Sequence, residues 1–130
     1  METVEEKIHL ANEECPTHKN RAECRSMLLP VRDTLDILMG RWKIPIIISL
    51  TFGSKRFGEI AKDLDGITDR MLSKELKELE INQLITRNVY STFPPKVEYS
   101  LTDHGRTLHL VIKELHNWGS LHRKKVLGNN

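Results

Sequence analysis

The segment from Lys55 to Thr102 constrains the fold most strongly, because two short helical patterns are followed directly by two strand patterns. The helical patterns are joined by Asp65-Gly66-Ile67, where the glycine can adopt a positive φ angle and turn the chain sharply. The strand patterns are joined by a loop that contains Phe93-Pro94-Pro95-Lys96. This order of elements predicts a helix-turn-helix with a β-hairpin, or wing, beside its second helix.

The second helix of this pair has an apolar side and a basic side. Thr68 is a suitable N-cap residue, Asp69 lies in the first turn, and the pattern continues to about Ile81. At about 100° per residue, leucines cluster on one side and basic residues lie nearly opposite, with Ser73 beside the basic ones. The two sets are Leu72, Leu76 and Leu79, and Arg70, Lys74 and Lys77. This pattern predicts that the leucine side packs in the core and that the basic side faces a groove of DNA.

A solvated helix face is the simpler interpretation of such basic residues when composition alone is considered. Their place on the second helix of a helix-turn-helix, next to a wing, instead favours contact with DNA. Glu75 and Glu78 fall on the flank of the same helix. We expect them to pair with lysines of that helix, and phosphate would repel them.

The two strand patterns run from Leu84 to Ser91 and from Val97 to Leu101. They alternate with a period of two residues and are rich in β-branched and aromatic residues, which is typical of a hairpin. Pro94-Pro95 stiffens the loop, and we expect Lys96 to lie at an exposed tip that meets the DNA backbone or the minor groove.

Helical patterns also flank this segment. From Val31, apolar residues fall on one helical face until Gly40 offers a stop, and a second helix restarts at Arg41-Trp42-Lys43 and runs through Leu50. After the hairpin, Thr102 is placed to cap a final helix that reaches at least Trp118. The sequence therefore predicts an α+β fold, mostly helical, with a two-stranded β-wing and with N- and C-terminal dimerisation helices.

The final helix carries an apolar face that a chain of 130 residues could not easily cover by itself. We therefore expect a homodimer whose surface is built by this helix and by the helices before the helix-turn-helix. The residues predicted to lie in this interface are Leu35, Trp42, Leu108, Val111, Ile112, Leu115 and Trp118.

Length and charge fit one domain with an added arm. Residues 1–28 form a polar N-terminal arm with four Lys/Arg against six Glu, and residues 29–130 form the helix-turn-helix domain. The net charge of the whole chain is only +2, so the positive excess lies in the domain. No apolar run approaches the roughly 20 residues that cross a bilayer, and the acidic start does not resemble a secretory signal. We expect a cytoplasmic protein without a membrane partner.

The sequence predicts no cofactor and no metal ion. Cys15 and Cys24 both lie in the arm and are expected to be free thiols in the cytoplasm. Together with His18 they could in principle hold a zinc ion, although three dispersed ligands make a weak site. Trp42 and Trp118 fit a core or a dimer interface better than a cofactor pocket.

An enzyme is not indicated, because the sequence contains no glycine-rich phosphate loop, nucleophile elbow, paired-carboxylate pocket or His-Glu-x-x-His motif. The stronger alternative is a winged-helix module that binds another protein, since winged helices also serve as interaction scaffolds. Salt separates the two functions, because binding through phosphate contacts weakens steeply as salt rises and an apolar protein interface does not.

Several fragments, in order and with compatible spacing, resemble the HxlR family of winged-helix transcription regulators, which are related in architecture to MarR proteins. The hairpin fragment is the most specific of them. The fragments are Pro30-Val31, Gly40-Arg41-Trp42-Lys43, Arg56-Phe57-Gly58-Glu59-Ile60, Gly66 to Ser73, and Pro94 to Thr102 followed by Gly105.

This resemblance implies a transcription regulator that binds a palindromic operator as a homodimer, with two recognition helices in successive major grooves of double-stranded DNA. Family members often carry a cysteine directly before Pro-Val, where this chain has Leu29, so a thiol switch of that form is not available here. Cys24 or Cys15 could take its place only if the local geometry differs. A small-molecule effector could bind between the core and the dimer helices, but no polar cluster in the sequence marks such a pocket.

The candidate DNA contacts divide by role. Arg70, near the helix start, is expected to read a base edge, since arginine can bind guanine with two hydrogen bonds. Ser73 and Lys74 could read a base or brace a phosphate, while residues near helix starts would hold phosphates. The full set is Lys55, Arg56, Thr68, Arg70, Ser73, Lys74, Lys77, Arg87 and Lys96.

Overall fold

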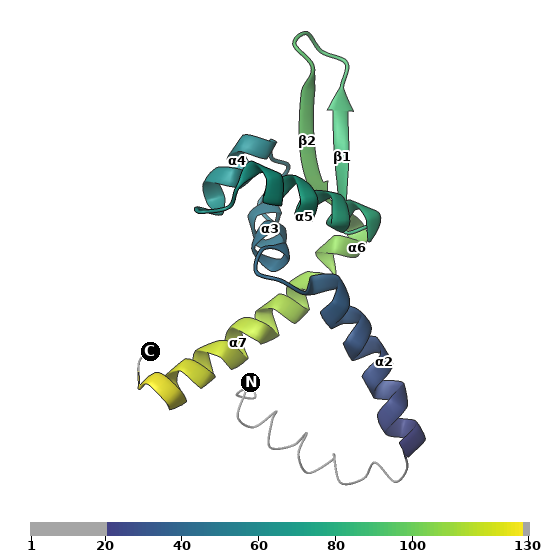
Figure 1. Cartoon of the computed structure of the whole chain (residues 1–130), viewed down its shortest axis with the longest axis vertical. Coiled ribbons are helices and arrows are strands. Elements are labelled where there is room, and N and C mark those ends of the chain that lie inside the picture. Colours follow the sequence, from purple (N-terminus) through teal and green to yellow (C-terminus); the bar gives the residue numbers. More distant parts are fainter. Residues whose placement is uncertain (1–20, 129–130) are drawn as a thin grey trace. The chain divides into compact units, whose positions relative to one another are not determined.

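The computed structural model describes residues 21–128. These residues divide into two compact units (Figure 1). Residues 37–109 form one, here called the winged-helix unit, and residues 21–36 with 110–128 form the other, the terminal-helix unit. Among the described residues, no helix is long and apolar enough to cross a membrane.

The winged-helix unit contains three helices, a hairpin and a short fourth helix in chain order. They are α3 (Lys43–Leu50), α4 (Phe57–Asp63), α5 (Asp69–Ile81), β1 (Ile85–Tyr90), β2 (Lys96–Leu101) and α6 (Asp103–Arg106). The two strands pair antiparallel, and the hairpin extends away from the helices beyond α5 (Figure 1). The predicted winged helix-turn-helix is confirmed.

Aliphatic side chains of α3, α4, α5 and the base of the hairpin form the core of this unit. The leucine side of α5 is buried, as its periodicity predicted. Burying one aliphatic side chain fully stabilises the folded state by about 1.5 to 3 kcal/mol. The largest fully buried side chains are Ile46, Ile47, Ile60, Leu72, Leu76, Leu79 and Ile85.

Helix α5 begins as its sequence predicted. Gly66 adopts a φ of +98° in the turn before it, a conformation that residues with a Cβ rarely adopt. The Thr68 hydroxyl oxygen then accepts a hydrogen bond of 3.1 Å from the backbone N–H of Met71, which satisfies one of the free donors of the first turn. These two residues fix the direction in which α5 leaves the turn.

The hairpin is tied to the rest of the unit at its base. Lys55 and Tyr99 exchange two backbone hydrogen bonds, of 3.0 and 2.8 Å, so the segment before α4 pairs with β2. On the other side, a Cβ added to Gly105 would lie 2.1 Å from the carbonyl oxygen of Leu84. Only glycine allows this approach of α6 to the start of β1.

The final helix is interrupted, which differs from the single helix expected after Thr102. Thr102 caps the short α6 by accepting a hydrogen bond of 2.8 Å from the N–H of Gly105. Thr107 then separates α6 from α7 (Leu108–Leu127), and its hydroxyl donates to the carbonyl of His104. Such a side-chain bond competes with the helical hydrogen bonds at this turn.

The N-terminal helix is longer than expected. Helix α2 spans Arg21–Leu38, so it begins ten residues before Val31 and contains Pro30. It continues without interruption across residues 28 and 29, where the sequence suggested that the arm meets the domain. That division into domains remains a prediction, and the zinc candidates Cys15 and His18 lie outside the described residues.

Candidate nucleic-acid interface

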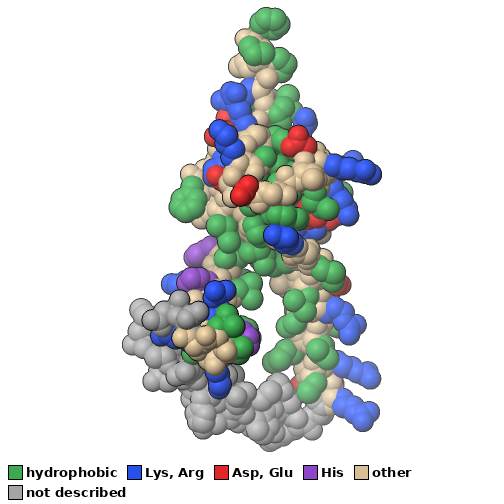
Figure 2. All heavy atoms as spheres, turned by 60° about the vertical axis from the view of Figure 1, so that its left-hand side comes forward, with side chains coloured by type: hydrophobic (Ala, Val, Ile, Leu, Met, Phe, Trp, Pro, Cys, Tyr) green, Lys and Arg blue, Asp and Glu red, His purple; other side chains and the backbone are tan. Residues whose placement is uncertain are grey.

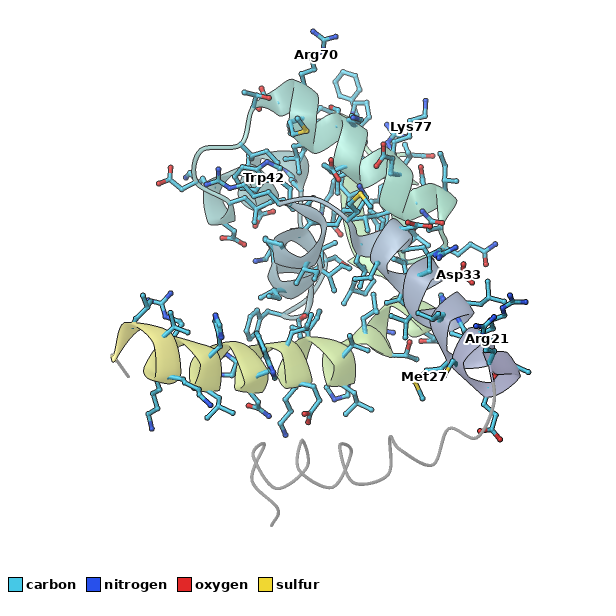
Figure 3. All side chains as sticks on the ribbon, turned by 60° about the horizontal axis from the view of Figure 1, so that its bottom comes forward. Arg21, Met27, Asp33, Trp42, Arg70 and Lys77 are labelled. Atoms are coloured by element: carbon cyan, nitrogen blue, oxygen red, sulfur yellow. The ribbon has the colours of Figure 1, made fainter. Side chains whose placement is uncertain are left out.

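The exposed side of α5 carries the basic residues that the periodicity placed there. Arg70, Ser73, Lys74 and Lys77 are all exposed, while the leucines on the opposite side are buried. Figure 3 shows Arg70 and Lys77 pointing outward from the helix. Within the described part of the chain, no ion pair joins Arg70 or Lys77 to a carboxylate. Their charges are therefore available to an anionic partner.

A groove between α5 and the hairpin brings several predicted DNA contacts together. Ser73 and Lys77 of α5 and Arg87 of β1 line a hollow of about 280 Å³, with Leu76 and Tyr99 as its apolar part. Glu80 also lines the groove, and its negative charge offsets one of the two positive charges of Lys77 and Arg87. This is the place where a phosphate could contact the helix and the wing at the same time.

The acidic flank of α5 is paired with a lysine of another helix, which the sequence interpretation did not predict. Glu75 and Glu78 each accept a hydrogen bond of 2.6 Å from Lys43 Nζ of α3, rather than pairing with lysines of α5. Burial disfavours the charge on Lys43, but these bonds outweigh it and raise its pKa. The hydrogen bond from Lys43 also lowers the pKa of Glu78. One ammonium thus offsets one of the two negative charges on this flank and holds both carboxylates toward α3.

Lys55 is engaged within the chain. Its ammonium forms an ion pair with Asp63, donates to Ser49 at 3.3 Å, and Ser49 in turn donates to Asp63 at 2.7 Å. The hydrogen bond from Lys55 lowers the pKa of Asp63. To hold a phosphate, as proposed from the sequence, Lys55 would have to leave Asp63.

This polar cluster also lines a hollow of about 460 Å³ between α3 and α4, which was not marked in the sequence. Its remaining lining residues are Pro45, Ile48, Phe52 and Leu64.

Arg56 and Thr68 lie at the starts of α4 and α5, as expected. The backbone N–H of Arg56 donates to Glu59 Oε1 at 3.0 Å, and the guanidinium remains exposed. The hydroxyl oxygen of Thr68 caps α5, which leaves its hydrogen free to donate. Both residues keep a donor that can reach a phosphate.

Lys96 does not lie at the hairpin tip. It is the first residue of β2, pairs with Glu98 at 2.9 Å, and its Nζ lies 5.7 Å from the centre of the Tyr90 ring. The loop itself, residues 91–95, contains no charged side chain, and its Phe93 is completely exposed (102%). Sequence reasoning focused on the lysine and missed this phenylalanine, although its place beside Pro94-Pro95 was visible.

The residues expected at a dimer interface are mostly accessible in the single chain. No residue of α7 is buried, and Leu115 and Trp118 are 50% and 52% exposed. Val111 of α7 and Leu35 of α2 are also exposed, while Trp42, Leu108 and Ile112 are partly exposed. The Trp118 ring stacks on His122, with the ring centres 4.9 Å apart. All of these observations come from a single chain, so the dimer stays a prediction.

No group of three metal-ligating side chains gathers among residues 21–128. Cys24 is exposed on α2 and forms no disulfide with a described residue.

Comparison with known proteins agrees with this geometry. Residues 37–126 match the model of the HxlR-like helix-turn-helix family. The chain is 47% identical over 97 residues to the uncharacterized HTH-type transcriptional regulator YdeP of Bacillus subtilis, covering 75% of this chain and 76% of that protein.

Two solved structures extend the comparison. The redox regulator HypR in its reduced form is 41% identical with a TM-score of 0.71, over 77% of this chain and 99% of that one. A regulator assigned to the MarR family from Enterococcus faecalis V583 is 31% identical with a TM-score of 0.71, over 87% and 97% of the two chains. These matches indicate a regulator rather than an enzyme, and this chain belongs to the HxlR-like helix-turn-helix family of transcriptional regulators.

Proposed function

We propose that this regulator is a cytoplasmic homodimer that binds a palindromic operator, with α5 of each protomer in the major groove. The observation that carries the proposal is the exposed basic side of α5, which is backed by buried leucines and continues into the groove shared with Arg87. A rigid helix with free donors along one side is the form in which proteins read base edges.

The geometry suggests a distinct role for each part of this surface. Arg70, in the first turn of α5, would read a base edge, and Ser73 and Lys74 lie close enough along the helix to support it. Lys77 and Arg87 would hold one phosphate in the groove between α5 and the hairpin. Arg56 and Thr68 would hold phosphates at helix starts, where the dipole favours an anion.

The apolar residues of α7 support the dimer. Leu110, Val111, Glu114 and Leu115 line a shallow hollow whose wall is almost entirely apolar. A helix with no buried residue and several exposed leucine, valine and tryptophan side chains gains stability when a second copy covers it. A two-fold dimer would present two α5 helices, which is what a palindrome requires.

The first experiment is a competition between short duplexes from beside the gene and random duplex, at two salt concentrations. A regulator of this kind is expected to prefer one palindromic site and to lose affinity steeply as salt rises. Light scattering on the same sample should give the mass of two chains. Binding that ignores salt and DNA sequence would instead favour a module that recognises a protein.

A further inference from the structure

The tip of the hairpin is apolar and uncharged, unlike the surface below it. Residues 91–95 contain no Lys, Arg, Asp or Glu, and the first lysine beyond them, Lys96, is paired with Glu98. Figure 2 shows hydrophobic side chains at the tip of the hairpin and Lys and Arg side chains lower down. A contact made by this tip cannot be mainly electrostatic.

The fold does not use the aromatic ring at this tip. Phe93 is completely exposed, and the neighbouring Val89 and Tyr90 are also exposed, so none of them contributes to the core. A ring of this size in water is an unfavourable arrangement that a partner would relieve. The ring is also carried by a loop that contains two prolines, which limits the entropy lost when it binds.

Position favours DNA as that partner. The groove lined by Lys77 and Arg87 lies where β1 passes α5, and β1 continues from Arg87 to the tip. A duplex held at this groove would lie next to the hairpin that carries Phe93. The minor groove is about 6 Å wide, half the width of the major groove, and a single side chain can enter it.

We propose that Phe93 inserts into the minor groove beside the site read by α5, where its ring acts as an apolar wedge against deoxyribose and base edges. Phenylalanine is among the side chains that proteins use to open base steps from the minor groove and bend the duplex. The wedge favours flexible pyrimidine–purine steps at its position, so it adds sequence preference without hydrogen bonds. The inference rests on the proposed DNA-binding function.

The test compares Phe93→Ser and Phe93→Leu with the unaltered protein, on the duplex that the unaltered protein selects from a randomised pool. Affinity is measured at two salt concentrations, and bending is measured by energy transfer between dyes at the duplex ends. Phe93→Ser should weaken binding at least about fivefold, reduce the bend and leave the salt slope unchanged, because no charge is removed. Phe93→Leu should retain most of the affinity and the bend. The thermal midpoints of both variants should match the unaltered protein, since the ring is outside the core.

Arg70→Ala serves as the matched reporter of the recognition helix. If Arg70→Ala weakens binding while Phe93→Ser changes neither affinity nor bend, Phe93 does not insert into DNA. A protein would then be the partner of the hairpin tip. If the unaltered protein selects no duplex at all, the proposed function fails, and the wedge fails with it. A Phe93→Ser variant that alters the salt slope would also overturn the apolar wedge.

Discussion

Lys43 of α3 is hydrogen-bonded to Glu75 of α5 at 2.6 Å, and their side chains are only 8% and 10% exposed. The same ammonium also donates to Glu78, so one buried cation holds both carboxylates on the flank of the recognition helix and offsets one of their two charges. Burying a charge is unfavourable unless it is paired and hydrogen-bonded, so each member of this cluster depends on the other. The cluster fixes where α5 sits on α3 and holds these two carboxylates toward α3.

Lys43→Met should destabilise the protein by about 3 to 5 kcal/mol, because it leaves Glu75 buried without a cation. Urea unfolding followed by circular dichroism measures the loss. The double variant Lys43→Met/Glu75→Leu should recover most of it, since apolar residues of similar volume can replace a buried pair. Lys62→Met, at an exposed position of α4, is the control and should stay near the unaltered protein. If the double variant recovers none of the lost stability, Lys43 acts through packing alone.

Stability should also depend on pH through the carboxylates that lysines hold. The pKa of Glu78 is lowered by its bond to Lys43 and that of Asp63 by its bond to Lys55, so both contribute stability above their ordinary pKa values of 4.5 and 3.8. This stability should be lost as the pH falls below that range, through the lowered values. Lys43 has a raised pKa, so its contribution should persist up to 10.5 and disappear above it. Urea midpoints across this range measure both edges, and in Lys43→Met the alkaline edge should be smaller.

Gly105→Ala should destabilise the winged-helix unit, because its methyl group would lie 2.1 Å from the Leu84 carbonyl and force α6 away from β1. Overpacking of this kind costs about 1 to 3 kcal/mol, and here the obstacle is backbone. Gly58→Ala is the matched control, since nothing lies within 4 Å of the added Cβ and alanine favours helix α4. The thermal midpoint of Gly105→Ala should fall and that of Gly58→Ala should hold or rise. Equal midpoints for the two would show that α6 can move freely.

The sequence was sufficient for α5 because a leucine period and a capping threonine are local signals, and both lie where the structure has them. The pairing of Glu75 was not readable, because its partner Lys43 lies 32 residues away along the chain. Neighbouring lysines on α5 were the nearer choice at helical spacing, but Glu75 is on the buried side.

At the hairpin, by contrast, the missed pairing had a local signal. Lys96 and Glu98 are two residues apart on one strand and therefore share a face, so their ion pair could have been expected. The break at Thr107 was less accessible, because a threonine in a helix can bond its own backbone or face solvent. The exposure of Phe93 could be predicted only with the register of the strands. That register pairs Tyr90 with Lys96 and leaves residues 91–95 as the loop.

Arg70→Ala and Lys77→Ala should differ in how they change DNA binding. Arg70→Ala is expected to lose about 1 to 3 kcal/mol on the preferred site and to relax the base preference there. Lys77→Ala should weaken all sequences alike and reduce the salt slope by about one charge, because it removes a phosphate contact. Lys96→Ala should have a smaller effect than Lys77→Ala, since Glu98 already holds its ammonium. Affinities for specific and random duplex at several salt concentrations separate these outcomes, and equal losses on both duplexes for Arg70→Ala would remove it from base reading.

Leu115→Glu should convert the proposed dimer to a monomer. The side chain is half exposed in the single chain and lines the apolar hollow of α7, so the substitution costs little in the monomer but places a charge where a second copy would pack. Light scattering should then give the mass of one chain, and affinity for a palindrome should fall much more than affinity for a half-site, because the two recognition helices no longer bind together. Lys113→Glu changes an exposed residue of the same helix and should leave the mass unchanged. A dimer that survives Leu115→Glu would place the interface on another part of the chain.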